Sequence, residues 1–517
     1  MNQTGHIFAK DARHHLWEAG IVLAFLAAMA WLGAYQFMPE GWVDRHAGYP
    51  ATMRLVGGLA IGFAPVTWWV LVTRLVHGEN LVGDRQWWIT KPYEWSRLLG
   101  AKVGFVAAFV LLPLVIADCV LLAVGGFSPL QFLGHVGWGL VLLTAFVLAP
   151  LMALAAVTSS FARLALTMLG LLAVLIAVFV VLAIAAPGGM ATPLTRVLAL
   201  PIVAGGSAAA IVLQYAQRRE WVARGVLAGT VIVLVGALLL SETTPFVKLA
   251  YPRGAAPFAM NYDAAAQPGF TSMSGNHRVS VPVPVSVSGI EPGTVANVDG
   301  IKLTVDGANG RTWTSNWEPM GGTRFDANRP SGVLGVQMSD AVYSAMHSQP
   351  VTMRLRLALT QLRAVQTTTV QLTDHEFTVP QFGICAPDPL MQSGQFGGFA
   401  CRTALRQPPQ TLISVEWSDV PCAERTAQSA PVAGEGWAGS ADEEDMSFNL
   451  LPVTGVGFSL SNSSQTNPDG SSGAPRYLCA GTPVTFTRYA MTRRVEYDVT
   501  LENVKLPEMK NEGVQAE

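Results

Sequence analysis

Seven apolar runs, each close to the length of a membrane-spanning helix, fill the first half of the chain and restrict how it can fold. A helix needs roughly 20 apolar residues to cross the core of a bilayer. The runs lie at about 17–38, 53–76, 99–124, 132–157, 164–186, 196–215 and 221–241. We therefore expect an α-helical, polytopic membrane domain over residues 17–241. Proline residues would bend four of its helices, at Pro65, Pro113, Pro150 and Pro201.

Basic residues are divided unevenly between the two sides of these predicted spans. The side of a membrane protein that is richer in Lys and Arg faces the cytoplasm. One side has Lys10, Arg13, Arg74, Arg85, Lys91, Arg97, Lys102, Arg163, Arg218, Arg219 and Arg224, and the other has Arg45, Arg54 and Arg196. We expect a protein of the bacterial cytoplasmic (inner) membrane, with its N-terminus in the cytoplasm and its C-terminal half outside. Gly205, Gly206 and Pro201 dilute the sixth run, and without that span the C-terminal half would be cytoplasmic.

Residues 1–16 precede the first run and combine basic with apolar side chains. Lys10 and Arg13 lie among apolar residues, which favours a short amphipathic helix at the cytoplasmic face. A cleavable signal peptide is the alternative, because residues 28–30 (Ala-Met-Ala) fit a small-x-small cleavage site behind a basic and then apolar segment. The apolar run continues through Phe37, so we favour a membrane span.

The loop at residues 77–102 is the longest polar break between two runs, and it lies on the predicted cytoplasmic side. Its apolar and charged residues are interleaved from Glu79 onward, which is typical of a short helix lying along a surface. Pro92 then breaks the pattern. A helix in this position requires either a protein partner or the membrane surface to cover its apolar side.

Several motifs in and around this loop resemble those of a known family. They are Asp84-Arg85, Trp88, Thr90-Lys91-Pro92, Arg97-Leu98-Leu99 and Lys102, together with residues 10–13 (Lys-Asp-Ala-Arg) and Ser159-Ser160. This pattern is similar to that of ABC-2 type transporter permeases, over roughly residues 1–220. The resemblance implies a coupling helix that docks into a separate cytoplasmic ATPase subunit. The residues that it assigns to this docking are Asp84, Arg85, Trp87, Trp88, Pro92, Tyr93, Trp95 and Arg97.

The aromatic residues of the loop also allow a simpler interpretation. Tryptophan and tyrosine side chains favour the headgroup level of a membrane, because one end of each ring is apolar and the other is polar. Trp87, Trp88, Tyr93 and Trp95 would anchor an interfacial helix without any partner. An anchor requires neither Asp84-Arg85 nor the proline turn, so we favour docking.

One carboxylate, Asp118, lies well inside a predicted span. An unpaired charge at that depth is costly, so its side chain should have a partner. His135 enters the next span from the same side, and we predict an intramembrane polar pair between Asp118 and His135. Such a pair would serve either as a polar contact on a transport path or as a structural link between two helices. We favour the structural link.

The second half of the chain has the pattern of an all-β protein. A linker over residues 242–263 is followed by short runs rich in β-branched and aromatic residues, separated by turn signals. The runs are His277–Val287, Val295–Val305, Arg311–Trp317, Val333–Met338, Val351–Leu359, Thr367–Leu372, Glu376–Val379, Thr411–Trp417, Val456–Ser461, Val484–Tyr489 and Arg494–Val504, and Ser339–His347 is predicted to be a helix. We expect β-sandwich architecture, as a sandwich at 264–375 and either a second one or a continuation of the first at 376–517.

Four of the five cysteines fall in this second half, which we place in an oxidising compartment. Cys385, Cys401, Cys422 and Cys479 are therefore predicted to form two disulfides, with three possible connectivities. We favour Cys385–Cys401 with Cys422–Cys479. No two cysteines have the C-x-x-C spacing of a zinc site, and we expect no metal or other cofactor.

Motifs for nucleotide hydrolysis and for other hydrolytic chemistry are absent from the sequence. It contains no G-x-x-x-x-G-K-[ST], H-E-x-x-H or G-x-S-x-G, so the chain is not expected to be an enzyme, and ATP hydrolysis would belong to a partner. Charged residues make up 13% of the chain, with a net charge of −2, and no cluster of basic residues indicates nucleic-acid binding.

The leading hypothesis is a permease subunit of an ABC-2-like exporter, driven through residues 79–97 by a separate cytoplasmic ATPase. It would act as a homodimer or with a related permease, in contact with membrane lipid and with a substrate or periplasmic partner still to be identified. Permeases of this family usually have six spans and no large outer domain, and the chain differs from them in both respects. The alternative is a non-transporting membrane anchor that displays a periplasmic β-sandwich for binding or envelope assembly.

Overall fold

The structure is a computed structural model of the chain. It describes residues 3–506 apart from 37–50, 80–93, 186–192, 241–243, 255–257, 264, 267–271, 275–277, 308–309, 321–322, 348, 381, 390–394, 405–410, 418–433, 440–451, 453 and 460–477. Within these limits the first half is helical and the second half is built of β-strands, which confirms the predicted change of fold class along the chain.

The helical half follows the predicted apolar runs. Its elements are α1 (Gln3–His14), α2 (Leu16–Gln36), α4 (Ala51–His77), α5 (Trp95–Val106), η2 (Ala107–Leu111), α6 (Leu112–Val124), η3 (Pro129–Phe132), α7 (Leu133–Leu143), η4 (Thr144–Leu148), α8 (Ala149–Val157), α9 (Phe161–Ala185), α10 (Pro193–Val212), η5 (Leu213–Gln217), α11 (Glu220–Leu240) and α12 (Thr244–Ala250). In the described residues, six helices are long and apolar enough to cross a membrane. A seventh is added if α1 and α2, which meet at an angle of 76°, count as one bent span.

Three of these elements, η2, η4 and η5, are π-helical turns that continue directly from an α-helix. Two of them have a proline just beyond, because Pro113 is the second residue of α6 and Pro150 is the second residue of α8. Proline lacks the backbone N–H, and its ring clashes with the carbonyl four residues earlier in a regular α-helix. A wider π turn relieves this conflict without ending the helix. Pro65 and Pro201 lie inside α4 and α10.

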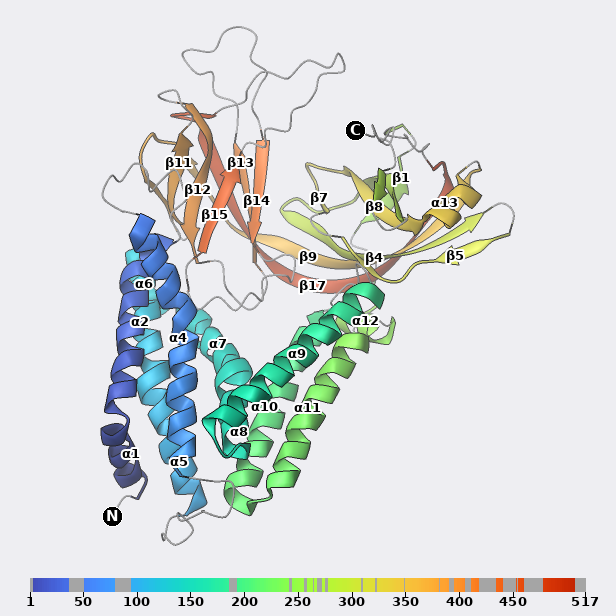
Figure 1. Cartoon of the computed structure of the whole chain (residues 1–517). Helices are drawn as coiled ribbons and strands as arrows, with labels where there is room; N and C mark the ends of the chain where they lie inside the picture. Colours follow the sequence, from blue (N-terminus) through green and yellow to red (C-terminus); the bar gives the residue numbers. More distant parts are fainter. Residues whose placement is uncertain are drawn as a thin grey trace, which may run out of the picture.

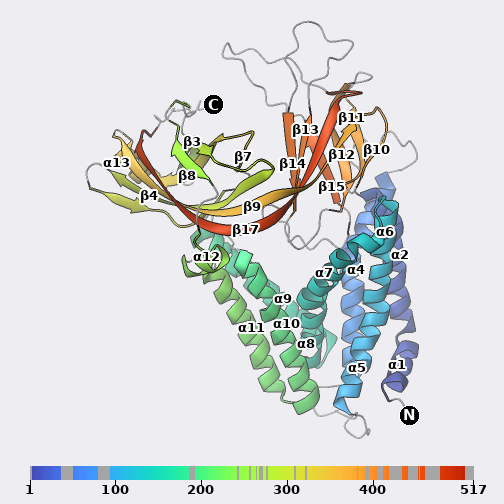
Figure 2. The same cartoon turned by 180° about the vertical axis from the view of Figure 1, so that it is seen from behind.

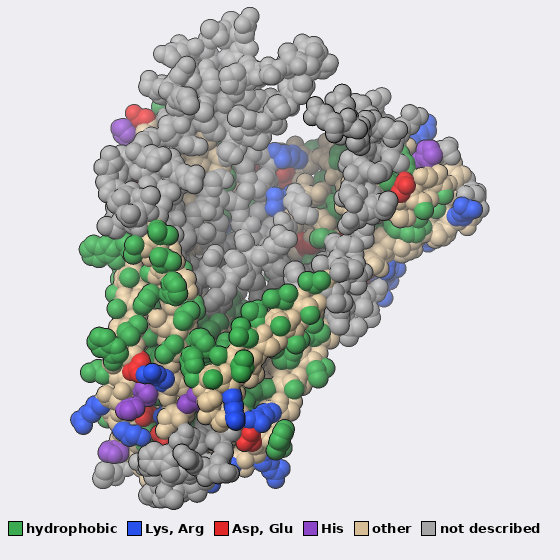
Figure 3. Space-filling model, viewed as in Figure 1, with side chains coloured by type: hydrophobic (Ala, Val, Ile, Leu, Met, Phe, Trp, Pro, Cys, Tyr) green, Lys and Arg blue, Asp and Glu red, His purple; other side chains and the backbone are tan. Residues whose placement is uncertain are grey.

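The helices form two groups that diverge toward the β-strands (Figure 1). The first helix group comprises α1, α2, α4, α5 and α6, and the second comprises α8, α10 and α11. The groups approach each other at the end of the molecule that carries the N-terminus, where α4 packs against α8, and the view from behind shows the same arrangement (Figure 2). The space-filling view shows hydrophobic side chains over the helices and charged side chains gathered at that end (Figure 3).

The described residues of the β region form one short helix and three sheets. Its elements are β1 (Ala259–Tyr262), β2 (Ser272–Ser274), β3 (Arg278–Ser288), β4 (Thr294–Gly307), β5 (Thr312–Thr314), β6 (Glu318–Pro319), β7 (Arg324–Asp326), β8 (Ser331–Ser339), α13 (Asp340–Met346), β9 (Val351–Gln371), β10 (Phe377–Val379), β11 (Gly383–Pro389), β12 (Gln395–Thr403), β13 (Thr411–Trp417), β14 (Gly434–Gly439), β15 (Thr454–Ser459), β16 (Leu478–Cys479) and β17 (Pro483–Val504). The helix predicted at 339–347 is confirmed as α13, and Ser339 caps it by accepting a hydrogen bond from the N–H of Val342.

An eight-stranded sheet runs through the whole β region, in the order β14-β13-β17-β9-β4-β5, with β6 and β7 also paired to β4. At one end it faces the sheet of β1, β2, β3 and β8. Alternate valines of β3, from Val279 to Val287, fill the core between them, as the two-residue period of a strand dictates. At its other end the large sheet faces β10, β11, β12, β15 and β16, across a core built around Phe399 and Phe486.

We call these two parts lobe 1 (β1–β8, α13, residues 351–363 of β9 and 491–504 of β17) and lobe 2 (β10–β16, residues 364–371 of β9 and 483–490 of β17). The strands β9 and β17 pair with each other along nearly their whole length and so belong to both lobes. The predicted boundary at residue 375 lies beyond the end of β9, whose last residue in the first core is Leu359, whereas residues 495–504 of β17 return to that core.

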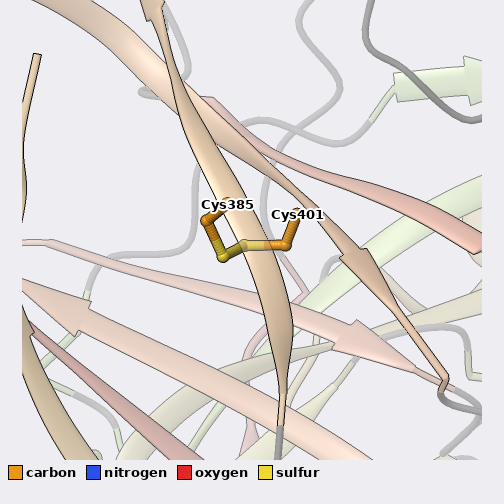
Figure 4. Close-up of a disulfide and its surroundings, with 2 residues drawn as sticks. All are labelled: Cys385 and Cys401. Carbon is orange, nitrogen blue, oxygen red and sulfur yellow. A yellow bond between two sulfur atoms is a disulfide. The ribbon is translucent and has the colours of Figure 1, made fainter. Parts of the chain in front are cut away.

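Cys385 and Cys401 form a disulfide, as predicted (Figure 4). The two residues lie directly opposite each other on the neighbouring strands β11 and β12. Cys479, on β16, is also disulfide-bonded. Its predicted partner, Cys422, lies outside the described residues, so the second pairing remains a prediction.

Candidate functional site

Most of the residues assigned to ATPase docking lie in the part of the chain that the structure does not describe. These are Asp84, Arg85, Trp87, Trp88, Pro92 and Tyr93. The other two lie at the start of α5, where Trp95 is 41% exposed and Arg97 is paired with Glu94 at 2.7 Å (Nε to Oε2). The described ends of the loop are Glu79, just after α4, and Glu94, just before α5.

A cluster of four charged side chains joins both ends of this loop to the N-terminal helix, and we call it the loop-base cluster. It consists of Lys10 and Asp11 of α1, of Glu79, which lies just after α4, and of Lys102 of α5. The Lys102 ammonium lies 2.8 Å from Oδ2 of Asp11 and 3.4 Å from Oε1 of Glu79. Lys10 donates a hydrogen bond of 3.3 Å to the same Glu79 oxygen.

Three members of the loop-base cluster are buried, and their burial determines how much stability is lost when one charge is removed. The exposed fractions of the Lys102, Asp11 and Glu79 side chains are 1%, 4% and 3%, whereas that of Lys10 is 44%. Buried charges contribute little net stability while they are paired. Removing one partner leaves the other charges buried without it, at a cost of several kcal/mol. Lys102 therefore holds α1, α5 and the end of α4 in one arrangement.

Further polar contacts at the same end of the molecule link the first helix group to the end of α8, and the end of α8 to α11. A ring nitrogen of His77, the last residue of α4, lies 3.2 Å from the hydroxyl of Thr158, just after α8. Arg224 of α11 donates hydrogen bonds of 3.0 Å and 3.2 Å to the carbonyl of Val157. Helix ends leave carbonyls without intrahelical partners, so this guanidinium satisfies a group that α8 cannot satisfy itself.

Tyr215 brings the π turn η5 close to the loop-base cluster. Its side chain is 1% exposed, and its hydroxyl has no hydrogen-bond partner among the described residues. The carboxylates of Asp11 and Glu79 lie within electrostatic range of this hydroxyl. The cluster is therefore surrounded by α1, α4, α5 and η5.

The predicted pair of Asp118 and His135 can be followed only in part. Asp118 lies in α6 and is buried, with 7% of its surface exposed. His135 lies in α7, but its side chain falls outside the described part of the chain. The pairing between the two side chains remains a prediction.

A second polar site joins α12 to lobe 1, and we call it the α12 joint. Asp299 is an extra residue in β4, where the pairing with β9 shifts between Val298 and Gly300. Such a bulge redirects a side chain. The Asp299 carboxylate accepts hydrogen bonds from the hydroxyl of Tyr251 at 3.0 Å, the hydroxyl of Thr360 at 2.5 Å and the amide of Asn297 at 2.6 Å.

Backbone and apolar contacts reinforce the α12 joint. The N–H of Glu496 donates to the carbonyl of Pro252 at 3.1 Å, and Arg253 forms a parallel bridge with Glu496. Val247, Tyr251, Trp317 and Ala358 pack together as one small core. Burial raises the pKa of Asp299 to about 6, although its three hydrogen bonds and the nearby Arg494 act in the opposite direction.

Sequence reasoning did not find the loop-base cluster or the α12 joint. Asp11 and Lys102 are 91 residues apart, and nothing in their local sequence indicates that they pair. The available signal was the placement of charged residues at the edges of apolar runs. Among the described residues, no group of three or more His, Cys, Asp or Glu side chains is arranged to hold a metal ion.

The fold and its polar sites define a chain with an apolar helical region that carries an all-β region. No protein-family model matches the chain, and no curated protein matches it. Among solved structures, the crystal structure of red sea bream transglutaminase aligns with 51% of this chain and 34% of its own chain, at 10% sequence identity and a TM-score of 0.12. The match spans about a third of that chain, and a likeness this weak carries no inference about fold or activity.

Proposed function

We propose that the chain is the membrane permease subunit of an ABC-2-like, ATP-driven exporter. The observation that supports this proposal most directly is the loop-base cluster. A loop that receives force from another protein needs ends that are fixed to the helices it moves. Glu79 and Lys102 stand on either side of the proposed docking segment and share one ion-pair network with α1.

In this mechanism the ATPase subunit pushes on residues 79–97, and the loop-base cluster passes the displacement to α1, α4 and α5 as a unit. The contact of His77 with Thr158 then transmits it to α8 in the second helix group. Rocking of one helix group against the other alternates access between the two sides of the membrane. The π turns beside Pro113 and Pro150 support the proposal, because such turns are frequent at functional sites of helices.

The proposed orientation places the loop-base cluster in the cytoplasm and the β region, with two β-sandwiches, outside the inner membrane. The Cys385–Cys401 disulfide supports this orientation, since disulfides persist in oxidising compartments. ATP hydrolysis belongs to the partner subunit, because the sequence lacks a P-loop.

Two helices supply surface for lipid or for a second permease chain. In the most apolar segments of α9 and α11, only 6% of the residues are buried within the molecule. Helices that are apolar on every side must be covered by lipid or by protein. This exposure supports a homodimer or a paired permease in the membrane.

The test is to purify the protein from its native membrane in a mild detergent and to identify bound ATPases. We expect an ATPase to co-purify, and we expect Arg85→Ala with Trp88→Ala to abolish the association while the yield of the chain is unchanged. Trp17→Ala is the matched control, because Trp17 is 79% exposed at the same end of the molecule but lies outside the loop. Absence of an ATPase from the unsubstituted protein would refute the proposal.

A second candidate function is a non-transporting anchor that displays the β region for binding or envelope assembly. The α12 joint favours it, since this joint attaches lobe 1 rigidly to the membrane helices. A reporter enzyme that is active only in the periplasm, fused after Glu517, should be active under both candidate functions. An active reporter without any bound ATPase would select the anchor, and an inactive reporter would refute the proposed orientation for both.

A further inference from the structure

The two lobes are attached to the helices in different ways, and the path of the chain shows this first. The chain leaves the second helix group through α12 and enters lobe 1 directly. It reaches lobe 2 only along β9 and returns from it only along β17. Lobe 2 therefore has no covalent connection to the helices except through lobe 1.

The paired strands that carry lobe 2 are irregular where they pass from one lobe to the other. Val365 is an extra residue in β9, because Arg488 pairs with Gln366 while Tyr489 pairs with Ala364. On the opposite strand, Thr492 is an extra residue in β17. Bulges bend a strand and interrupt its ladder of hydrogen bonds.

The flanking strands also change at this position, from β4 beside β9 in lobe 1 to β13 beside β17 in lobe 2. The described pairing of β4 with β9 runs as far as Arg363, and that of β13 with β17 runs as far as Ala490, which is the partner of Arg363. Among the described residues, no flanking strand continues from one lobe into the other, so β9 and β17 alone run through both. A bulged segment in which only two strands continue is the place where the two lobes can bend relative to each other.

Lobe 2 also touches the first helix group, through an apolar contact at the turn between α6 and α7. Phe127, 6% exposed, packs in a small core with Leu122, Phe132, Val136 and, from lobe 2, Ala404. The fit is close, since a Cβ on Gly383 would lie 2.9 Å from the Phe127 ring and one on Gly126 would lie 3.2 Å from Ile384. Such a contact is either seated or separated, because closely packed surfaces do not deform gradually.

We propose that lobe 2 is a releasable clasp on the outer end of the first helix group, while lobe 1 stays fixed to the second helix group through the α12 joint. When the clasp is seated, the β region holds the diverging ends of the two helix groups at a set separation. When it lifts, bending at Val365 and Thr492 lets the groups separate further. This inference rests on the contacts alone and holds whichever of the two candidate functions is correct.

The test is a pair of distance measurements by spin labels on the full chain in lipid nanodiscs. The clasp is spanned by labels at Leu130→Cys and Thr378→Cys, and the α12 joint by labels at Leu249→Cys and Thr500→Cys, all of which are exposed positions. Cys119→Ala removes the free thiol. Phe127→Ala weakens the contact, and Leu133→Ala, at the first residue of α7, which is 50% exposed, is the matched control.

Across the clasp we expect a second, longer distance beside the short one. The population of the longer distance relative to the short one should rise about tenfold or more in Phe127→Ala and should be unchanged in Leu133→Ala. The distance across the α12 joint should remain single in every variant. The proposal is overturned if Phe127→Ala leaves one short distance across the clasp. It is also overturned if the distance across the α12 joint broadens as much as the distance across the clasp.

Discussion

The loop-base cluster and the α12 joint both bury carboxylates where distant parts of the chain meet, but they neutralise the charge differently. Asp11 and Glu79 share the ammonium of Lys102, so their partner is another buried charge. Asp299 accepts hydrogen bonds from two hydroxyls and one amide, all of which are neutral. The loop-base cluster depends on the Lys102 cation, because its removal leaves two buried carboxylates without their ammonium partner. The α12 joint can relieve its charge by taking up a proton.

The largest effect is expected when the cation of the loop-base cluster is removed. Lys102→Met leaves Asp11 and Glu79 buried without it, and loss of one partner from a buried ion pair costs about 3–5 kcal/mol. Denaturant unfolding of the detergent-solubilised protein, followed by circular dichroism of its helices, measures this loss.

Lys10→Met is the matched control for Lys102→Met, because Lys10 binds the same Glu79 oxygen but is 44% exposed. Its effect should be below about 1 kcal/mol, as for other partly exposed ion pairs. A triple variant with Lys102→Met, Asp11→Asn and Glu79→Gln should recover part of the lost stability. Equal effects of the two lysine substitutions would show that burial of the pair does not matter.

The next largest effect concerns the covalent link of lobe 2, for which the helical region has no counterpart among the described residues. Replacing both Cys385 and Cys401 by serine opens a loop with a sequence separation of 16. Closing a loop of this size stabilises a fold by about 3 kcal/mol. Fluorescence of Trp417, which packs against Phe399, would report unfolding of lobe 2. Unfolding of the helices should be unchanged, and a matching loss there would mean that the two regions unfold together.

The pH dependence of the α12 joint tests how its charge is relieved. The pKa of Asp299 is about 6 in the folded protein, against 3.8 for an ordinary aspartate. The stability that protonation of Asp299 contributes is therefore fully present below about pH 3.8. It is lost as the pH rises to about 6, a change in the unfolding free energy on the order of 2–3 kcal/mol. Asp299→Asn removes this dependence and should be more stable than the unsubstituted protein at pH 7.

The fluorescence of Trp317 reports unfolding of the α12 joint directly, because Trp317 packs beside Tyr251. Unfolding curves from its fluorescence should differ between Asp299→Asn and the unsubstituted protein at pH 7, and they should converge near pH 4. Tyr251→Phe is a control that removes one hydrogen bond and keeps the carboxylate. Curves that remain parallel from pH 4 to pH 7 would mean that Asp299 does not take up a proton in this range.

The smallest effect is expected from an exposed ion pair near the loop-base cluster. Arg74 lies 2.6 Å from Glu18, but its side chain is 62% exposed. Pairs in contact with solvent contribute about 0–1 kcal/mol. Arg74→Ala should therefore change the unfolding free energy by less than 1 kcal/mol in the assay used for Lys102. A loss as large as that of Lys102→Met would show that Glu18 belongs to the buried network.

The division of the chain into a helical half and a β half could be predicted because its signals are local. Apolar runs of sufficient length give the helices, and alternation of two residues gives strands such as β3 and β13. The predicted runs Val351–Leu359 and Thr367–Leu372 are parts of one strand, β9, and the last two predicted runs are joined in β17. Alternation fails at the bulges, so a bent strand looks like two short ones in the sequence.

The polar sites could not be predicted because they depend on partners far apart in the chain. Asp299 has no special local pattern, and only the pairing of β4 with β9 shows that it is an extra residue directed toward Tyr251. The resemblance to permeases drew attention to Lys10–Arg13 and Lys102 but did not indicate that Asp11 and Lys102 form an ion pair. The short-range Cys385–Cys401 disulfide, by contrast, was among the pairings that the sequence favoured, and the structure confirms it.

The adjacent entry and exit of lobe 2 suggest how it could be exchanged. Gln371 at the end of β9 lies opposite Pro483 at the start of β17, so residues 372–482 begin and end at neighbouring points. A short hairpin turn in their place would close the two strands and leave the lobe 1 core complete. Lobe 2 is therefore organised as a cassette, which recombination could replace without rebuilding the rest of the protein.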